Sequence, residues 1–192
     1  MQLFGPALPD GLTIIEEFLT VAEHDNCLRE IDSQPWSTDL NRRTQHYGSK
    51  YDYTTGKAIG AGSAPDPPAP LRAVAVKLVD LGFYDVEPDQ IIVNEYIVDG
   101  ENVQGIAAHR DRTDSFGPVI ATVSLKESWA MRFTNNEESL EAILPARSVA
   151  VMTGDARYLW KHSVPPRKFD TSQSIKIRRH RRVSLTFRSL LR

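Results

Sequence analysis

The chain has 192 residues, of which 41% are hydrophobic and 25% are charged, an ordinary composition for one globular domain with a net charge of −2. No apolar run approaches the roughly 18 residues of a membrane span, and the single cysteine, Cys27, excludes an internal disulfide and a cysteine-rich zinc site. The opening residues, MQLFGP, contain no basic segment before an apolar core, so no secretory signal is predicted. We expect one domain over residues 1–192, in a cytoplasmic monomer without a membrane partner.

The charge is distributed unevenly along the chain. Residues 157–192 carry 11 Lys and Arg but one acid, whereas residues 1–156 carry 12 basic and 24 acidic side chains. The densest basic segment is residues 176–182, KIRRHRR. Such a segment can bind phosphate groups. It can equally be a solvated strand edge that its charge protects from aggregation, and the composition leaves both interpretations open.

The first 60 residues are predicted to form a strand, a helix and a polar segment. Residues 11–18 have the pattern of a short strand. Thr20 and Glu23 have the spacing of a capping box, which predicts that a helix begins there and continues to about residue 33. The inward side chains of this helix would be Val21, Cys27, Leu28 and Ile31. Residues 40–60 are basic and aromatic, which predicts strand pieces and loop with exposed aromatic side chains.

The remaining residues predict one more helix and then many short strands. Leu71, Val74, Leu78 and Leu81 have helical spacing, and Gly82 is a helix-ending residue. Short β-prone runs follow at residues 90–98, 118–125, 129–133, 140–144, 148–152 and 183–190. Helices followed by closely spaced strands predict an α+β fold. The best candidate is a double-stranded β-helix, or jelly roll, with the N-terminal helices packed on one sheet.

A possible metal site lies in the sequence His109-Arg110-Asp111. Alternate residues of a strand point to the same face, so His109 and Asp111 can converge on one point. A third ligand from a distant strand, with His162 as the candidate, would complete two imidazoles and one carboxylate, the set that suits a non-haem Fe(II) oxygenase. The motif alone is also compatible with ordinary surface or core polar residues.

Two other strands show the same alternation. Asn94 and Tyr96 share one face of the first, and Arg182, Ser184, Thr186 and Arg188 share one face of the last. If this face points inward, the two arginines need an anionic partner, because an unpaired buried cation costs several kcal/mol. A dicarboxylate cosubstrate would fit the guanidinium fork. The alternative is a structural salt bridge, with Asp111 as one possible partner.

Taken together, these motifs resemble the AlkB family of Fe(II)- and 2-oxoglutarate-dependent dioxygenases, which act on nucleic acid bases. The resemblance covers about residues 36–190 and is carried, in order, by Asn94-Glu95-Tyr96, His109-x-Asp111, FGPVIATVSL at 116–125, Met152-Thr153-Gly154, Arg157-Tyr158-x-Trp160-x-His162 and Arg182-x-Ser184-x-Thr186-x-Arg188. It implies a nucleotide-recognition lid at about residues 36–60 and a jelly-roll core at about residues 90–190.

The resemblance also implies roles for individual residues. Iron would be bound by His109, Asp111 and His162, and O2 would be the second cosubstrate. The 2-oxoglutarate pocket would be lined by Asn94, Tyr96, Arg182, Ser184 and Arg188, with Arg182 on the distal carboxylate. Substrate contacts would come from Arg43, Tyr47, Tyr51, Thr113 and Asp114, with Tyr47, Tyr51 or Trp160 stacking on the base and Arg42, Arg43 or the basic segment on phosphates.

Two positions depart from the pattern of the DNA-repair members. Ser184 stands where the family usually has asparagine, as in the tRNA-modifying animal members, and Thr113 stands where an acid often contacts the base, with Asp114 one step later. The expected function is oxidative demethylation of alkylated bases in DNA or RNA, with formaldehyde, succinate and CO2 as products. The alternatives are hydroxylation of a tRNA wobble uridine by the same chemistry and, third, a catalytically silent nucleic-acid-binding module.

Overall fold

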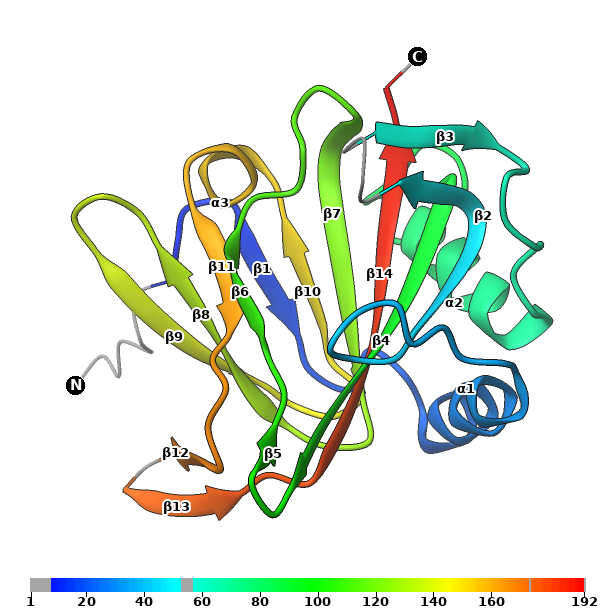
Figure 1. Cartoon of the computed structure of the whole chain (residues 1–192). Helices are drawn as coiled ribbons and strands as arrows, with labels where there is room; N and C mark the ends of the chain where they lie inside the picture. Colours follow the sequence, from blue (N-terminus) through cyan, green and yellow to red (C-terminus); the bar gives the residue numbers. More distant parts are fainter. Residues whose placement is uncertain (1–7, 53–56, 173, 192) are drawn as a thin grey trace.

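The computed structural model describes residues 8–52, 57–172 and 174–191, with side chains described outside residues 50–61, and in this part of the chain two antiparallel sheets face each other (Figure 1). The larger sheet has the order β1 (Leu12–Ile15), β10 (Val149–Met152), β7 (Phe116–Leu125), β14 (Arg181–Leu190), β4 (Gln90–Asp99), β2 (Thr44–Asp52) and β3 (Lys57–Ala61), with β5 (Asn102–Val103) paired to β4. The smaller sheet has the order β6 (Ile106–His109), β11 (Lys161–Val164), β8 (Trp129–Thr134) and β9 (Ser139–Leu144). The predicted jelly roll is confirmed.

Two helices cover the outer face of the larger sheet (Figure 1). In α1 (Val21–Ser33) the predicted capping box is present: the Glu23 amide donates to the Thr20 hydroxyl, and the Glu23 carboxylate accepts from the Thr20 amide. The second helix, α2 (Ala69–Asp80), is followed two residues later by Gly82, whose positive φ of 77° is the left-handed conformation that closes a helix. The inward orientation predicted for Val21 and Leu81 is wrong, because both are exposed.

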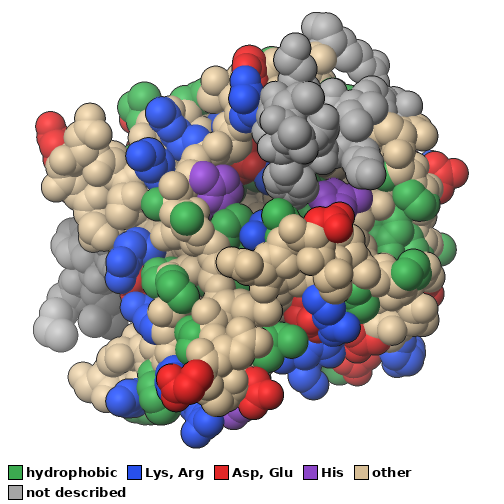
Figure 2. All heavy atoms as spheres, in the orientation of Figure 1, with side chains coloured by type: hydrophobic (Ala, Val, Ile, Leu, Met, Phe, Trp, Pro, Cys, Tyr) green, Lys and Arg blue, Asp and Glu red, His purple; other side chains and the backbone are tan. Residues whose placement is uncertain are grey.

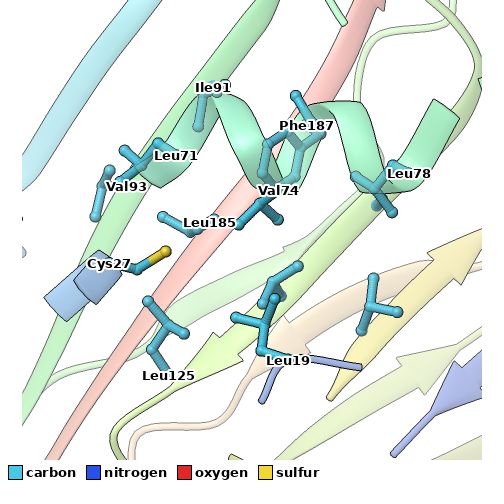
Figure 3. Packing of buried hydrophobic residues seen from close by; sticks show 14 of the residues in the cluster. Leu19, Cys27, Leu71, Val74, Leu78, Ile91, Val93, Leu125, Leu185 and Phe187 are labelled. Atoms are coloured by element: carbon cyan, nitrogen blue, oxygen red, sulfur yellow. The ribbon is translucent and has the colours of Figure 1, made fainter. Parts of the chain in front are cut away.

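Alternation along β14 separates two hydrophobic clusters, one on each face of the larger sheet. Val183, Leu185 and Phe187 point toward the helices, where they pack with residues such as Leu71 and Leu78 (Figure 3). The second cluster lies between the two sheets and includes Ile120 from β7, Trp129 from β8 and Tyr96 from β4. The even-numbered residues of β14, including both arginines, therefore face the space between the sheets.

The predicted lid segment is mostly sheet. Residues Thr44–Gly48 of β2 pair with β4, with Tyr47 opposite Ile91. Since Ile91 faces the helices, Tyr47 does too, and its side chain is buried with its hydroxyl donating to Gln45 (3.0 Å). The prediction of an exposed stacking residue at Tyr47 is wrong, and the side chain of Tyr51 lies outside those described.

The basic segment at residues 176–182 is divided between three environments. Its first part is the exposed strand β13 (Ile175–Arg178), paired with β12 (Phe169–Ser172). Arg179 is buried and donates two hydrogen bonds to Asp170, at 2.7 and 2.8 Å. Arg181 donates to the buried Glu95 at 2.8 Å. Arg179 and Arg181 therefore have internal carboxylate partners, which leaves the start of the segment as its exposed part.

Candidate metal centre

Two histidines lie side by side where the strands of the smaller sheet end. His109, at the end of β6, is the direct cross-strand partner of His162 in β11, and their ring centroids are 4.4 Å apart. Asp111 follows just after β6, and the candidate ligand atoms of the three residues lie within 4.8 Å of one another. Among the described residues, this is the one cluster of His, Cys, Asp or Glu with metal-binding proximity. The residues that the motif singled out are thus brought together.

The surroundings of both imidazoles suit metal binding. Nδ1 of His109 lies 2.8 Å from the Ala107 carbonyl, which can only accept, so Nδ1 is the donor of this hydrogen bond and Nε2 is the ring atom that can face a metal. Burial lowers the pKa of His162 to about 4, against the partial opposition of the Asp111 carboxylate. At neutral pH the His162 ring is therefore uncharged, as a metal ligand must be.

The carboxylate of Asp111 is held ionised in a buried position. Burial by itself raises its pKa, but nearby positive charge, above all the Arg188 guanidinium, outweighs burial, so the pKa lies below its usual value. Arg188 forms an ion pair with Oδ1. The other oxygen, Oδ2, accepts no hydrogen bond within the described part of the chain and lies 3.5 Å from Nε2 of His162. A buried carboxylate oxygen without a donor needs a cation, and a divalent metal supplies one.

Arg157 fixes the loop that carries Asp111, a role that the sequence did not predict. It lies in the short helix α3 (Gly154–Tyr158) and is 2% exposed. Its guanidinium donates to four main-chain carbonyls, those of Asp111 (2.7 Å), Arg112 (3.1 Å), Phe116 (3.2 Å) and Gly117 (3.2 Å). The turn between β6 and β7 is thus tied to α3, so the position of the Asp111 backbone depends on Arg157.

A cavity of about 290 Å³ between the sheets opens onto His109, Asp111 and His162. Its polar lining includes Asn94 and Tyr96 from β4, Arg188 from β14, and Arg42 from the loop before β2. Arg42 donates to the Asn94 side chain at 2.8 Å and lies over the Tyr96 ring, 6.0 Å from its centroid. Three of the five residues predicted for the cosubstrate pocket therefore surround the metal cluster, and Arg42 joins them.

The two other predicted pocket residues, Arg182 and Ser184, are buried in β14 outside this lining. One guanidinium nitrogen of Arg182 donates to Ser124 of β7 at 2.8 Å, a partner that no motif indicated. Its Nε and Nη1 atoms have no acceptor within the described residues, and burial lowers the pKa of this arginine to about 10. A buried cation with two unused donors fits a carboxylate ligand.

The predicted substrate residues are in different surroundings. Arg43 donates to both oxygens of Glu95, at 2.5 and 2.8 Å, and stacks on Trp36. Thr113 and Asp114 line an exposed cavity beside the metal cluster, where Asp114 is ion-paired with Arg112. Trp160 is buried between the sheets, so the stacking role suggested for it is wrong.

Comparison with known proteins gives matches along most of the chain. The family model described as 2OG-Fe(II) oxygenase superfamily matches residues 11–188. The uncharacterized protein L905 of Acanthamoeba polyphaga mimivirus is 33% identical over 189 residues, which cover 95% of this chain and 86% of that protein. Among solved structures, OsALKBH1 superposes with a TM-score of 0.69 at 19% identity, covering 98% of this chain and 99% of that one, which supports the fold.

A second relative is longer than this chain. The tRNA (carboxymethyluridine(34)-5-O)-methyltransferase ALKBH8 of Mus musculus is 33% identical over 180 residues. The match covers 88% of this chain but 26% of that protein, so this chain spans about a quarter of the length of that relative.

In the described part of the present chain, none of the helices has the length and apolar character of a membrane span.

Proposed function

The chain belongs to the 2OG-Fe(II) oxygenase superfamily and to its AlkB-like members, and from this we propose that it oxidatively demethylates an alkylated base in DNA or RNA. It is a dioxygenase whose cofactor and cosubstrates are Fe(II), 2-oxoglutarate and O2. The observation that carries the proposal is the convergence of His109, Asp111 and His162 with Arg188 on one cavity between the sheets.

The residues present fit these groups. His109, Asp111 and His162 would hold the iron, whose charge the bare Oδ2 atom of Asp111 requires. Arg182 would bind the distal carboxylate of 2-oxoglutarate through its unused Nε and Nη1 atoms, and Asn94 and Tyr96 would border the same ligand. When bound, iron with 2-oxoglutarate and O2 supplies the oxidant that hydroxylates a substrate C–H bond, leaving succinate and CO2.

The protein contributes position and exclusion of water. Arg188 and Arg157 hold Asp111 from two sides, through its carboxylate and its backbone carbonyl, so the metal ligands are set before substrate arrives. Apolar side chains of Ile92, Ile106, Phe116 and Met131 line the cavity and limit solvent around the reacting carbon. A base inside a duplex would have to be flipped into this cavity, at a cost of roughly a few kcal/mol.

A second candidate function is hydroxylation of a tRNA base, and the charge around the cavity favours it. Arg42, Arg110 and Arg112 all line the cavity, whereas the acid nearest the expected base contact, Asp114, is ion-paired with Arg112. The excess positive charge there would repel a cationic methylated base, but it would not repel a neutral base. The 33% identity to the mouse ALKBH8 segment points to the same branch.

Mass spectrometry on three substrate classes separates the candidates. The protein, loaded with Fe(II) and 2-oxoglutarate, is incubated in air with methylated single-stranded DNA, methylated RNA and bulk tRNA. Loss of a CH2 mass with formaldehyde release indicates demethylation, because a hydroxylated N-methyl group falls off. Gain of one oxygen mass without formaldehyde indicates hydroxylation of a carbon side chain. Turnover of 2-oxoglutarate with no change in any nucleic acid would overturn both candidates.

A further inference from the structure

Three cavities meet at Arg110, the residue between two candidate metal ligands. It lines the cavity that contains the candidate metal ligands. It also lines a cavity of about 480 Å³ beside Thr113 and Tyr158, and a cavity of about 510 Å³ beside Asn135 and Lys161. Its guanidinium donates to the Tyr158 carbonyl at 2.7 Å, which ties it to the end of α3. Arg110 therefore borders all three hollows, one of which contains the candidate metal ligands.

The largest of these cavities offers hydrogen-bond donors. Its lining comprises Arg110, Thr134, Asn135, Asn136, Glu137, Leu159 and Lys161, from the β8–β9 turn and the start of β11. Lys161 is exposed, and no carboxylate of the described residues lies within salt-bridge distance of its ammonium group. The Asn135 side-chain oxygen accepts from the Glu137 and Glu138 amides, so its amide nitrogen is left to donate outward. Two cations face one acid, Glu137.

Large side chains beside these cations are exposed to solvent. Tyr158 is 38% exposed and Leu159 is 59% exposed, and each lines a cavity that Arg110 also lines. On the face that Figure 2 shows, Lys and Arg side chains gather beside a His side chain at the upper left. Basic groups interleaved with an exposed aromatic are the usual surface for a single strand of nucleic acid, which contributes phosphates and stacking bases.

We propose that the backbone of the substrate strand crosses the protein here, with a phosphate flanking the target base bound by Lys161 and Arg110. This inference rests on the proposed nucleic acid substrate and places its strand. Lys161 precedes the candidate ligand His162 and Arg110 follows the candidate ligand His109, so each cation is adjacent in sequence to a ligand, and both line one cavity at this end of the smaller sheet. Of the cations expected from sequence to do this, Arg43 and Arg179 are occupied by Glu95 and Asp170.

The test compares charge changes at two lysines. Anisotropy of a fluorescent single-stranded RNA, and of DNA of the same length, is measured against salt with anaerobic protein carrying Fe(II) and 2-oxoglutarate. For Lys161→Gln the slope of log K against log salt should fall by about 0.7, the value for one lost phosphate contact on a single strand. For Lys161→Glu the affinity should fall about tenfold or more at low salt. Lys176→Gln, on the exposed strand β13, is the matched control and should keep the parent slope.

Each outcome has a definite meaning. An unchanged slope in Lys161→Gln overturns the inference while leaving the proposed function intact. A fall of the slope in Lys176→Gln instead would place the strand on the basic segment and equally overturn it. Failure of the unaltered protein to bind or oxidise any nucleic acid would contradict the proposed function itself, and the inference with it.

Discussion

Replacing Arg157 by methionine should weaken both the fold and the metal site. Methionine retains much of the volume but removes the guanidinium that donates to four carbonyls at 2.7–3.2 Å. At about 1 kcal/mol net for each hydrogen bond, the free energy of unfolding should fall by about 4 kcal/mol. Since a domain of ordinary stability has about 5–15 kcal/mol, urea denaturation of the metal-free protein will register this as a large decrease in the midpoint.

The metal contribution is measured by repeating the denaturation with Co(II), a redox-stable substitute for Fe(II). At a concentration 100 times its dissociation constant, Co(II) should stabilise the parent by about 2.7 kcal/mol. In Arg157→Met the Asp111 loop is released, and a tenfold weaker site would gain about 1.4 kcal/mol at the same Co(II) concentration. The control is Arg147→Met, which removes a partly exposed arginine bonded to Glu17 and the Leu19 carbonyl. Its free energy of unfolding should fall by about 1 kcal/mol at most, and Co(II) should stabilise it as much as it stabilises the parent. Equal unfolding free energies for parent and Arg157→Met would refute the reasoning.

Four further changes test the site and its support. His109→Ala should abolish the visible charge-transfer band of the anaerobic protein with Fe(II) and 2-oxoglutarate, and a retained band would remove His109 from the ligand set. Arg182→Lys should raise the KM for 2-oxoglutarate at least about tenfold, because lysine cannot reproduce the two donors of the fork; an unchanged KM would mean that Arg182 is structural. In metal-free protein, unfolded chains bind a proton at His162 near pH 6.5 but folded chains do so only near 4, so the free energy of unfolding should fall by roughly 1 kcal/mol per pH unit between these values as pH is lowered. Urea melts of His162→Gln should show a shallower pH dependence over that window. Asp170→Asn leaves the buried Arg179 without a carboxylate and should cost about 3–5 kcal/mol in urea melts, a loss that would be absent if the pair were dispensable.

Strand periodicity carried most of what could be predicted about the site. The alternation placed Asn94 with Tyr96 and Arg182 with Arg188, and the structure shows both sets on the inner face of adjacent strands. Periodicity does not say which face of a sheet the helices will cover. Only the structure shows that the apolar residues of β14 pack beneath α1 and α2. The same uncertainty explains why Tyr47 was expected to be exposed. Tyr47 pairs with Ile91 of β4, whose side chain faces the helices, so the Tyr47 side chain faces them too.

The roles that sequence reasoning missed depend on partners without a sequence pattern. Arg157 binds main-chain carbonyls, which any residue type provides, so no spacing in the sequence could indicate its role. Arg42 reaches Asn94 from a loop 52 positions away. Arg179 was one of several adjacent cations, and only the fold shows that Asp170 neutralises it. Long-range charge pairing of this kind depends on topology, which local composition does not encode.

The position of β14 has a consequence for how the chain can fold. This strand, the last in chain order, lies between β7 and β4 in the middle of the larger sheet, so residues from three distant segments must be present before its ladders can form. During synthesis β4 and β7 would wait with open edges until about residue 190 has left the ribosome. The acidic partners of the basic residues in β14 are synthesised earlier than β14 itself. Arg181 therefore pairs with Asp32 and Glu95 when β14 enters the sheet. Assembly of the cavity between the sheets and completion of the larger sheet are therefore one event.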